Sequence, residues 1–292
     1  MKQDAANKTR SKRHFGRLHL LPGYLILGIW CAFTVLLVGA VIFSSLSTTP
    51  EIFDGRLLAS GLHFENFATA WRAQNISVFF LNSLVYSVTA TALTMVISTP
   101  AAYVLSRIRF RGNKLIQASF ATAQGVPLCM IVLPLYGVLA SLGMLRSPAT
   151  IQPTLIFLYT GISIPYTVIY LLAFFSTIST SYEEAAIIDG CTREKAFWRI
   201  MFPLAQSGVI TVSVFNFLNI WNEYFMSMIF ASGDKVRPLS VGLYALYNSM
   251  RYTGNWAGLF AAVVIIFLPT FVMYVLLSNK IIAGITAGGV KG

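Results

Sequence analysis

One segment of the sequence combines acidic, small and apolar residues at spacings that suit the binding of another protein. It covers residues 180–204 and reads TSYEEAAIIDGCTREKAFWRIMFPL. Ser181 and Glu184 have the spacing of a capping box, which starts a helix. Gly190 favours the left-handed conformation that ends a helix, and Thr192 is a suitable N-cap for a second one. The pattern predicts two short helices separated by a turn at Gly190.

This predicted helix–turn–helix carries more apolar surface than a water-facing loop requires. Partner helices bury such a face in a groove, so we interpret the segment as a docking element. An amphipathic helix that lies on the membrane surface is the alternative. Alanines permit close approach of a partner, and a carboxylate offers it a charged contact. The candidate docking residues are Glu183, Glu184, Ala185, Ala186, Asp189, Gly190, Phe197 and Pro203.

A second group of polar residues lies within an apolar stretch, residues 208–230. At about 100° per residue, Asn216, Asn219 and Glu223 fall within about 60° of one another on a helix. Polar groups in a membrane span usually face a cavity or a partner helix. Amides and a carboxylate can donate to or accept from the hydroxyl groups of a polar solute, whereas hydrogen bonding between helices is the alternative role. The candidate translocation-path residues are Asn216, Asn219, Asn222, Glu223 and Tyr224.

Membrane-spanning helices must position these residues, because the composition excludes an ordinary soluble domain. Of the 292 residues, 56% are hydrophobic and 11% are charged, whereas soluble domains carry about 25% charged residues. A helix needs about 20 apolar residues to cross a bilayer, and barrel strands are much shorter than the apolar windows seen here. We predict an all-α integral membrane protein with six transmembrane helices, at about 22–46, 78–105, 115–139, 152–175, 208–230 and 257–277.

The distribution of basic residues predicts the orientation of the chain. The net charge is +11, and most Lys and Arg residues lie in the N-terminal segment and in the connections after the second and fourth spans. Basic residues accumulate in cytoplasmic loops, so we expect both termini to be cytoplasmic. The expected parts are a basic segment over 1–21, a transmembrane domain over 22–279 and a tail over 280–292. This placement argues against a nucleic-acid groove, and the three scattered cysteines show no metal-ligand spacing.

The docking segment resembles the EAA loop of permease subunits of bacterial ATP-binding-cassette (ABC) importers. The family pattern is Glu-Ala-Ala, three residues, Gly, nine residues, then Ile-x-Leu-Pro. The matching residues are Glu184, Ala185, Ala186, Gly190, Ile200 and Pro203, and Phe202 replaces the usual Leu. The string Trp221-Asn222-Glu223-Tyr224 and the Gly-rich ending 284–292 narrow the resemblance to carbohydrate importers, specifically to MalG-type permeases. The resemblance extends from the first span to the last residue.

The resemblance implies one half of an alternating-access importer with a MetI/MalG-like fold in the bacterial inner membrane. In this family two homologous permeases assemble with two cytoplasmic ABC ATPases and an extracellular solute-binding protein. The EAA loop fits a cleft on the ATPase, so the candidate docking residues become candidate ATPase-coupling residues. The last outer connection reaches toward the binding protein, although aromatic residues at such positions are usually interfacial anchors. Its candidate residues are Tyr244, Tyr247, Asn248 and Arg251.

The chain itself is expected to be a transport subunit and not an enzyme. The sequence contains no Gly-Lys dipeptide and therefore no phosphate-binding loop, so ATP and Mg²⁺ should bind to the partner ATPases and no cofactor to this chain. The other expected contacts are a carbohydrate, in particular an oligosaccharide, and membrane lipid, but no nucleic acid. The alternatives are an importer permease for a non-sugar solute and an ion-coupled secondary transporter, which usually needs buried acids.

Overall fold

The computed structural model describes residues 20–72 and 75–289, which form helices joined by short connections. No strand occurs within these described residues, which confirms the all-α class. The apolar runs become helices because backbone groups in lipid must pair within their own segment. The longest elements are α2 (Leu21–Ser45), α5 (Ile76–Arg107), α8 (Pro148–Thr177), α12 (Gln206–Trp221) and α15 (Trp256–Gly289).

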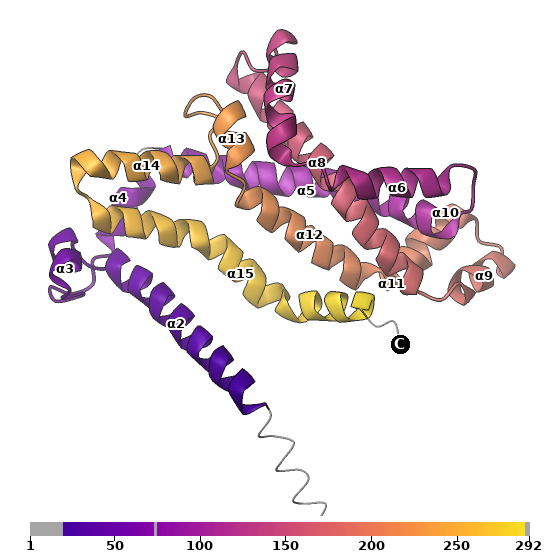
Figure 1. The fold of residues 1–292 in the computed structure, drawn as a ribbon, viewed down its shortest axis with the longest axis horizontal. Coiled ribbons are helices and arrows are strands. Elements are labelled where there is room, and N and C mark those ends of the chain that lie inside the picture. Colours follow the sequence, from indigo (N-terminus) through magenta and orange to yellow (C-terminus); the bar gives the residue numbers. More distant parts are fainter. Residues whose placement is uncertain (1–19, 73–74, 290–292) are drawn as a thin grey trace, which may run out of the picture.

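Four helices are long and apolar enough to cross a membrane: α2, α5, α8 and the Trp256–Ser278 part of α15. The number of spans rises to six if each of two bent helix pairs is one span. Helices α5, α8, α12 and α15 run side by side, whereas α2 diverges from them and touches mainly α15 (Figure 1). Helix α2 therefore leaves its apolar surface largely uncovered by the rest of the chain.

The third predicted span is sharply bent. Helices α6 (Asn113–Ala123) and α7 (Leu128–Ser141) meet at 95°. Pro127 is the N-cap of α7 and has an extended backbone. The extended backbone at Pro127, with ψ of 133°, interrupts the helix at this point. The apolar segment predicted over 115–139 is therefore present, as two helices with a break between them.

The fifth predicted span, 208–230, is not continuous either. Helix α12 ends at Trp221, and the short helix α13 (Phe225–Phe230) begins after a break. The Glu223 carboxylate accepts the backbone N–H groups of Met226 and Ser227, which a continuing helix would pair with carbonyls four residues earlier. The single helix predicted here, and the common polar face computed from it, are therefore wrong.

The last helix extends beyond the predicted span. Helix α15 runs without a break to Gly289, so the predicted tail continues the sixth span as helix over 280–289. Residues 290–292 lie outside the described residues, as do residues 1–19 of the predicted basic segment.

The core is built by close contact of spanning helices. Helices α5 and α8 form the most extensive contact in the described part of the chain. The buried face of α5 carries small side chains, among them Ser83, Ser87, Ala90 and Thr94. Lipid tails are as apolar as leucine, so helices associate in lipid through packing, and small residues let two backbones approach closely.

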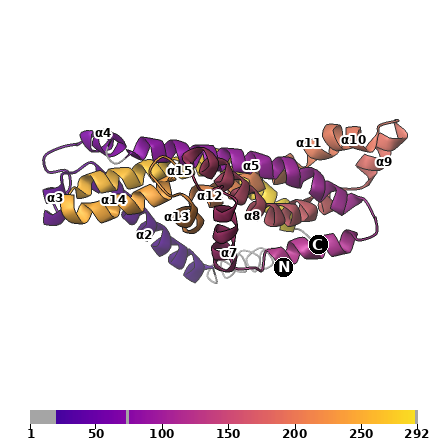
Figure 2. The ribbon, with the colours of Figure 1, turned by 90° about the horizontal axis from the view of Figure 1, so that it is seen from above.

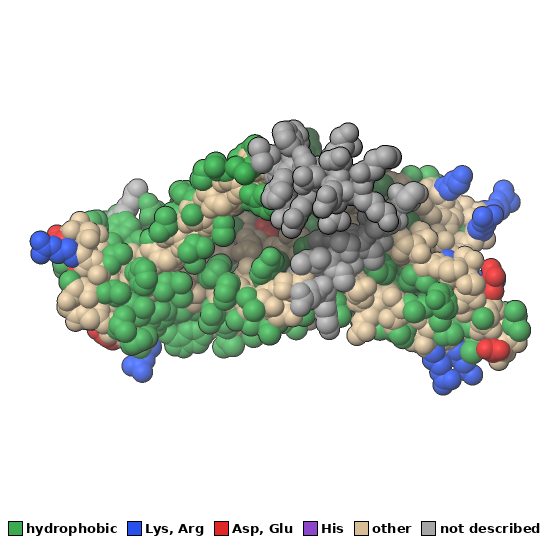
Figure 3. Space-filling view, turned by 90° about the horizontal axis from the view of Figure 1, so that it is seen from below, with side chains coloured by type: hydrophobic (Ala, Val, Ile, Leu, Met, Phe, Trp, Pro, Cys, Tyr) green, Lys and Arg blue, Asp and Glu red, His purple; other side chains and the backbone are tan. Residues whose placement is uncertain are grey.

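Charged side chains lie at the two ends of the elongated molecule. Figure 3 shows Lys, Arg, Asp and Glu at both ends of one face, with mainly hydrophobic side chains between them. One end carries α9 (Ser181–Ile188) and α10 (Arg193–Ala196), and the other carries α3 (Thr49–Asp54) and α14 (Leu239–Thr253), as Figures 1 and 2 show. We refer to them as the α9 end and the α14 end. This charge distribution suits a membrane across the middle of the bundle.

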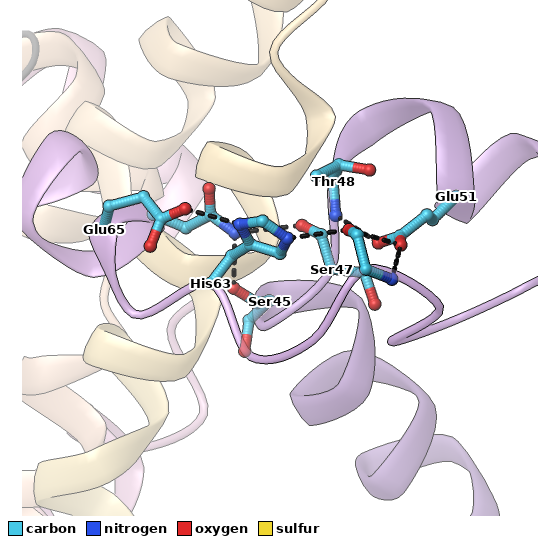
Figure 4. A network of polar contacts seen from close by, with 8 residues as sticks. Ser45, Ser47, Thr48, Glu51, His63 and Glu65 are labelled. Carbon is cyan, nitrogen blue, oxygen red and sulfur yellow. Dashed lines mark hydrogen bonds and ion pairs between the residues drawn. The ribbon is translucent and has the colours of Figure 1, made fainter.

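At the α14 end, a network of hydrogen bonds fixes the connection between α2 and α4 (Glu65–Arg72), as Figure 4 shows. We call Glu51, Ser60, His63 and Glu65 the polar clasp. The Ser60 hydroxyl donates to Glu51 Oε1 at 2.6 Å, and the backbone N–H groups of Ser60 and Thr48 donate to the same carboxylate at 2.5 and 2.8 Å. These bonds, with the Ser60 hydroxyl as the largest cause, lower the pKa of Glu51 to about 2.

His63 extends the polar clasp to the start of α4. A serine hydroxyl has one hydrogen, and Ser60 gives it to Glu51, so Ser60 accepts from His63 Nε2 at 2.8 Å. His63 Nδ1 lies 2.5 Å from Glu65 Oε1, and this bond lowers the pKa of Glu65. The clasp therefore joins the connection after α2 to α4.

Candidate functional site

The segment predicted to dock a partner forms the helix–turn–helix at the α9 end. Gly190 has φ of +80°, which confirms the left-handed turn between the two helices. The Thr192 hydroxyl accepts the backbone N–H of Lys195 at 3.3 Å, which confirms the predicted N-cap. The capping box predicted at Ser181 is wrong. Thr180 is the N-cap of α9, without a side-chain cap, and the Ser181 hydroxyl bonds to that of Ser179.

The second half of the segment changes helix type before it enters α12. A five-residue π-helical turn, Phe197–Met201, follows α10 and leads into α11 (Phe202–Leu204). Pro203 lies in α11, directly after the π-helical turn. The chain then turns by 73° at Ala205 into α12. The segment is thus connected directly to a helix of the bundle.

Glu183 ties α9 to two spanning helices. The Tyr103 hydroxyl, near the end of α5, donates a hydrogen bond to Glu183 Oε1. Arg107 Nε lies 3.9 Å from Glu183 Oε2, and both side chains are largely buried, at 6% and 14% exposed. Arg107 also donates from Nη2 to the carbonyl oxygens of Phe175 and Ile178 at the end of α8, at 2.6 and 2.5 Å. Glu183 and Arg107 therefore connect α9 to the ends of α5 and α8.

Two further residues of the segment are buried beneath α9. Phe197 is 4% exposed. The centroid of its ring lies 4.8 Å from that of Tyr103 and 6.4 Å from that of Phe175. Ala186 is 3% exposed. These two predicted docking residues face the protein's own core, where they hold the segment against the bundle.

The remaining predicted docking residues face outward. All of them are exposed to solvent: Glu184, Ala185, Asp189, Gly190 and Pro203. Apolar side chains beside them are also uncovered: Ile187, Ile188 and Trp198 are 46%, 85% and 55% exposed. An outward face with a free carboxylate, a small residue and several large apolar groups is suited to a partner with an apolar groove.

The structure separates the three asparagines that the sequence grouped together. Asn216 is buried and donates to the Thr167 hydroxyl of α8 at 2.8 Å. Asn219 is exposed, and so is Asn222, whose amide donates to the Leu218 carbonyl at 2.8 Å. Asn216 therefore links two helices, while Asn219 is free to meet a solute or another chain.

Glu223 lies in the break between α12 and α13 and is surrounded by hydrogen-bond donors. Its carboxylate accepts the N–H of Met226 at 2.6 Å and the N–H and hydroxyl of Ser227 at 3.0 and 2.8 Å. The Tyr159 hydroxyl of α8 donates to it at 3.2 Å, and its own carbonyl accepts from Ser240 of α14 at 2.6 Å. Glu223 thereby fixes an irregular backbone inside the bundle, a feature that membrane proteins tolerate where protein or a cavity surrounds it.

The predicted outer residues all lie on α14. Tyr244 packs edge-to-face against Tyr224, with ring centroids 5.8 Å apart, so this pair joins α14 to the break after α12. Tyr247 is 43% exposed and Asn248 is partly exposed. Arg251 belongs to α14, but its side chain lies outside the described part of the chain.

Sequence reasoning missed the residues that hold these groups in place. Tyr103 and Arg107 lie four residues apart on α5, the spacing that puts two side chains on one helix face. This spacing, just before a basic stretch, could have indicated that the two side chains act together. Ser227 follows Glu223 by four residues in the same predicted span, whereas Tyr159 comes from another predicted span and shares no local pattern with Glu223. Within the described residues, no cluster of three or more His, Cys, Asp or Glu side chains could hold a metal ion.

Comparison with known proteins gives consistent matches over most of the chain. Residues 95–281 match the family described as binding-protein-dependent transport system inner membrane component. The diacetylchitobiose uptake system permease protein NgcG of Streptomyces coelicolor is 31% identical over 266 residues, which cover 91% of this chain and 87% of that protein. The sulfoquinovosyl glycerol transport system permease protein SmoH of Agrobacterium fabrum is 32% identical over 254 residues, which cover 86% and 87%.

A solved structure has the same fold. It is the crystal structure of a bacterial ABC transporter involved in the import of the acidic polysaccharide alginate, which matches with a TM-score of 0.76 at 22% identity. The match covers 92% of this chain and 97% of that chain.

Proposed function

The chain belongs to the family of binding-protein-dependent transport system inner membrane components, and we propose that it forms one half of the translocation path of an ATP-driven carbohydrate importer. It is a multi-pass protein of the inner membrane. The observation that carries the mechanism is the arrangement of residues 180–204, which we call the α9 segment. Its outer face is open to a partner, while Glu183 on its inner face is bonded to Tyr103 of α5.

In this proposal the α9 segment couples the permease to an ATPase. Glu184, Ala185 and Ile188 present a charged, a small and an apolar contact to a cleft on the partner. Movement of the ATPase would push α9, and the contacts of Glu183 with Tyr103 and Arg107 would pass that movement to α5 and α8. Phe197 and Ala186 keep the segment rigid, so that it moves as a unit. The assigned side of the membrane for α9 and for both termini is the cytoplasm.

The energy source lies on other subunits in this proposal. Two ABC ATPases bind ATP and Mg²⁺ and hydrolyse the nucleotide, and this chain supplies no catalytic group. A second, homologous permease completes the path, and an extracellular solute-binding protein delivers the solute at the α14 end. Tyr244, Tyr247 and Asn248 lie at that end and are the candidate contacts for the binding protein.

The substrate class follows from the relatives and fits the polar groups in the bundle. The relatives carry names of permeases for diacetylchitobiose and sulfoquinovosyl glycerol, both sugar derivatives. Among the candidate path residues, Asn219 and Asn222 are exposed and offer amides that donate to and accept from sugar hydroxyls. Glu223 positions the break beside them. We assign the transported solute to the oligosaccharides.

The proposal is tested with the assembled importer. The chain is co-expressed with the ATPase and the binding protein of the same system, purified, and reconstituted in vesicles. We expect co-purification of the ATPase, stimulation of ATP hydrolysis by a saccharide-loaded binding protein, and vanadate-sensitive saccharide uptake. Uptake that persists without ATP, or that depends on an ion gradient, would replace the proposal by a secondary transporter. Stimulation by amino acids but not by saccharides would replace the substrate class alone.

A further inference from the structure

A cavity that the transport function does not use lies at the α9 end of the molecule. It has a volume of about 870 Å³ and is formed by the last turn of α5, the connection after it and the first turns of α6. This volume is within the range of about 300–1,000 Å³ that small-molecule sites occupy. The connection between α5 and α6 lies at the same end of the molecule as α9 and α10 (Figure 1).

The charge of the cavity selects an anion. Arg109 and Lys114 line it, and its lining within the described residues includes no carboxylate. Neither cation takes part in an ion pair in the described part of the chain. Arg107, by contrast, is engaged with Glu183 and with the carbonyls at the end of α8. Two positive charges thus remain without an acidic partner around one hollow.

The polar floor of the cavity is already formed. The Asn113 amide donates to the carbonyl oxygens of Leu105 and Ile108 at 3.1 and 2.8 Å. The Gln117 amide donates to Leu105 at 3.0 Å and to Asn113 Oδ1 at 2.5 Å. These bonds pair the carbonyl oxygens of Leu105 and Ile108 and hold the Asn113 and Gln117 side chains in place. A ligand would therefore meet a fixed site that needs little rearrangement.

The other part of the lining is apolar and exposed. Phe110 and Leu115 line the cavity and are 40% and 71% exposed. Ile116, the next residue on α6, is 40% exposed, and α6 buries no residue in the described part of the chain. A free phosphate ion would leave these apolar side chains uncovered. A molecule with both a phosphate group and hydrocarbon chains would cover both parts of the site.

We propose that this cavity binds an anionic phospholipid, with its phosphate between Arg109 and Lys114 and its hydrocarbon chains along Leu115 and Ile116 of α6. Basic pockets between helices at the membrane surface recognise acidic lipid headgroups in this way. The site adjoins Ser106 and therefore the turn of α5 that carries Arg107. A bound lipid would hold the end of α5 at the place where the α9 segment is attached.

The test uses the assembled importer purified in detergent, with bound lipid counted by native mass spectrometry. Phosphatidylglycerol is the anionic probe and phosphatidylcholine the neutral one. We expect phosphatidylglycerol to be retained in preference. The double variant Arg109→Gln/Lys114→Gln should bind it roughly thirty-fold more weakly, about 2 kcal/mol for two basic residues. The matched control Arg193→Gln/Arg199→Gln removes the same charge from the same end, outside the cavity, and should bind within about twofold of the unaltered protein.

Three results would overturn the proposal: equal affinity in the double variant, an equal loss in the control, or displacement of the lipid by millimolar inorganic phosphate. The last result would assign the site to a soluble anion. A photoactivatable phosphatidylglycerol supplies a measurement that needs no variant. It should label peptides within residues 105–117, and labelling confined to other segments would also overturn the proposal.

Discussion

Tyr103 and Glu183 join a spanning helix to the loop beyond it, through a hydrogen bond from the tyrosine hydroxyl to the glutamate carboxylate. We expect Tyr103→Phe to weaken coupling, because a hydrogen bond to a charged group contributes about 1.5–3 kcal/mol. The ring stays in place against Phe197, so the fold should persist. In proteoliposomes, the number of solute molecules transported per ATP hydrolysed should fall severalfold.

Tyr182→Phe is the control for this prediction. Tyr182 lies on α9, next to Glu183, and is 52% exposed. It should leave the transport-to-hydrolysis ratio unchanged. A normal ratio in Tyr103→Phe would mean that movement of α9 reaches the bundle by another contact, such as the packing of Phe197.

Gly190 provides a graded test of the α9 segment. Its φ of +80° is strained for most residues, by about 1–2 kcal/mol, whereas asparagine tolerates it. We expect saccharide-stimulated ATP hydrolysis to fall in the order Gly190→Asn, Gly190→Ala, Gly190→Pro, since proline cannot adopt a positive φ. Membrane insertion should be normal in all three variants, because the turn lies outside the spans. Full transport by Gly190→Pro would contradict the docking role of the turn.

Glu184 should be needed for contact with the ATPase and not for the fold. Its side chain is exposed, and α9 begins at a different N-cap, Thr180. We expect Glu184→Lys to lower the amount of ATPase that co-purifies with the chain by roughly tenfold, equivalent to about 1.4 kcal/mol. Glu184→Gln should have a smaller effect, because it removes the charge without reversing it. Unchanged recovery of the ATPase with Glu184→Lys would remove Glu184 from the interface.

Asn216 and Asn219 should differ in what they control. Asn216 donates to Thr167, and such bonds between membrane helices average about 0.6 kcal/mol and reach about 1.7 kcal/mol. Asn216→Ala should therefore lower the melting temperature of the purified complex. Asn219 is exposed, so Asn219→Ala should leave stability unchanged and reduce uptake. A double-mutant cycle of Asn216 with Thr167 measures the first effect, and normal uptake in Asn219→Ala would take Asn219 out of the path.

The sequence was sufficient where one local rule decided the structure. Apolar length predicted the spanning segments because lipid leaves a long apolar run no alternative to a helix. Gly190 and Thr192 were predicted correctly because a left-handed turn and a side-chain cap each depend on one residue and its immediate neighbours. The family pattern in the same segment supplied the functional class.

The sequence was insufficient where distant groups compete for the same backbone. Hydropathy treats residues 208–230 as one span because it does not register that a carboxylate satisfies backbone N–H groups. In the fold, Glu223 does this for Met226 and Ser227, and Tyr159 of another helix helps to hold it. Likewise, Glu183 and Glu184 are adjacent acids in the sequence. Only the position of Tyr103 and Arg107 on α5 makes Glu183 an internal anchor and leaves Glu184 outside.

The polar clasp at the α14 end should open in acid. The fold lowers the pKa of Glu51 from 4.5 to about 2, so the stability it contributes is complete above about pH 4.5 and is lost as pH falls toward 2. Protonation of the Glu51 carboxylate removes an acceptor for Ser60 and Thr48. The other titratable groups of the network are His63, which contacts Ser60, and Glu65, which contacts His63. We expect hydrogen exchange of residues 48–66, corrected for the intrinsic rate, to accelerate between pH 5 and pH 3. Glu51→Gln should show the faster exchange already at pH 7 and little further change. Exchange that is the same at pH 5 and pH 3 in the unaltered chain would mean that Glu51 does not hold this segment.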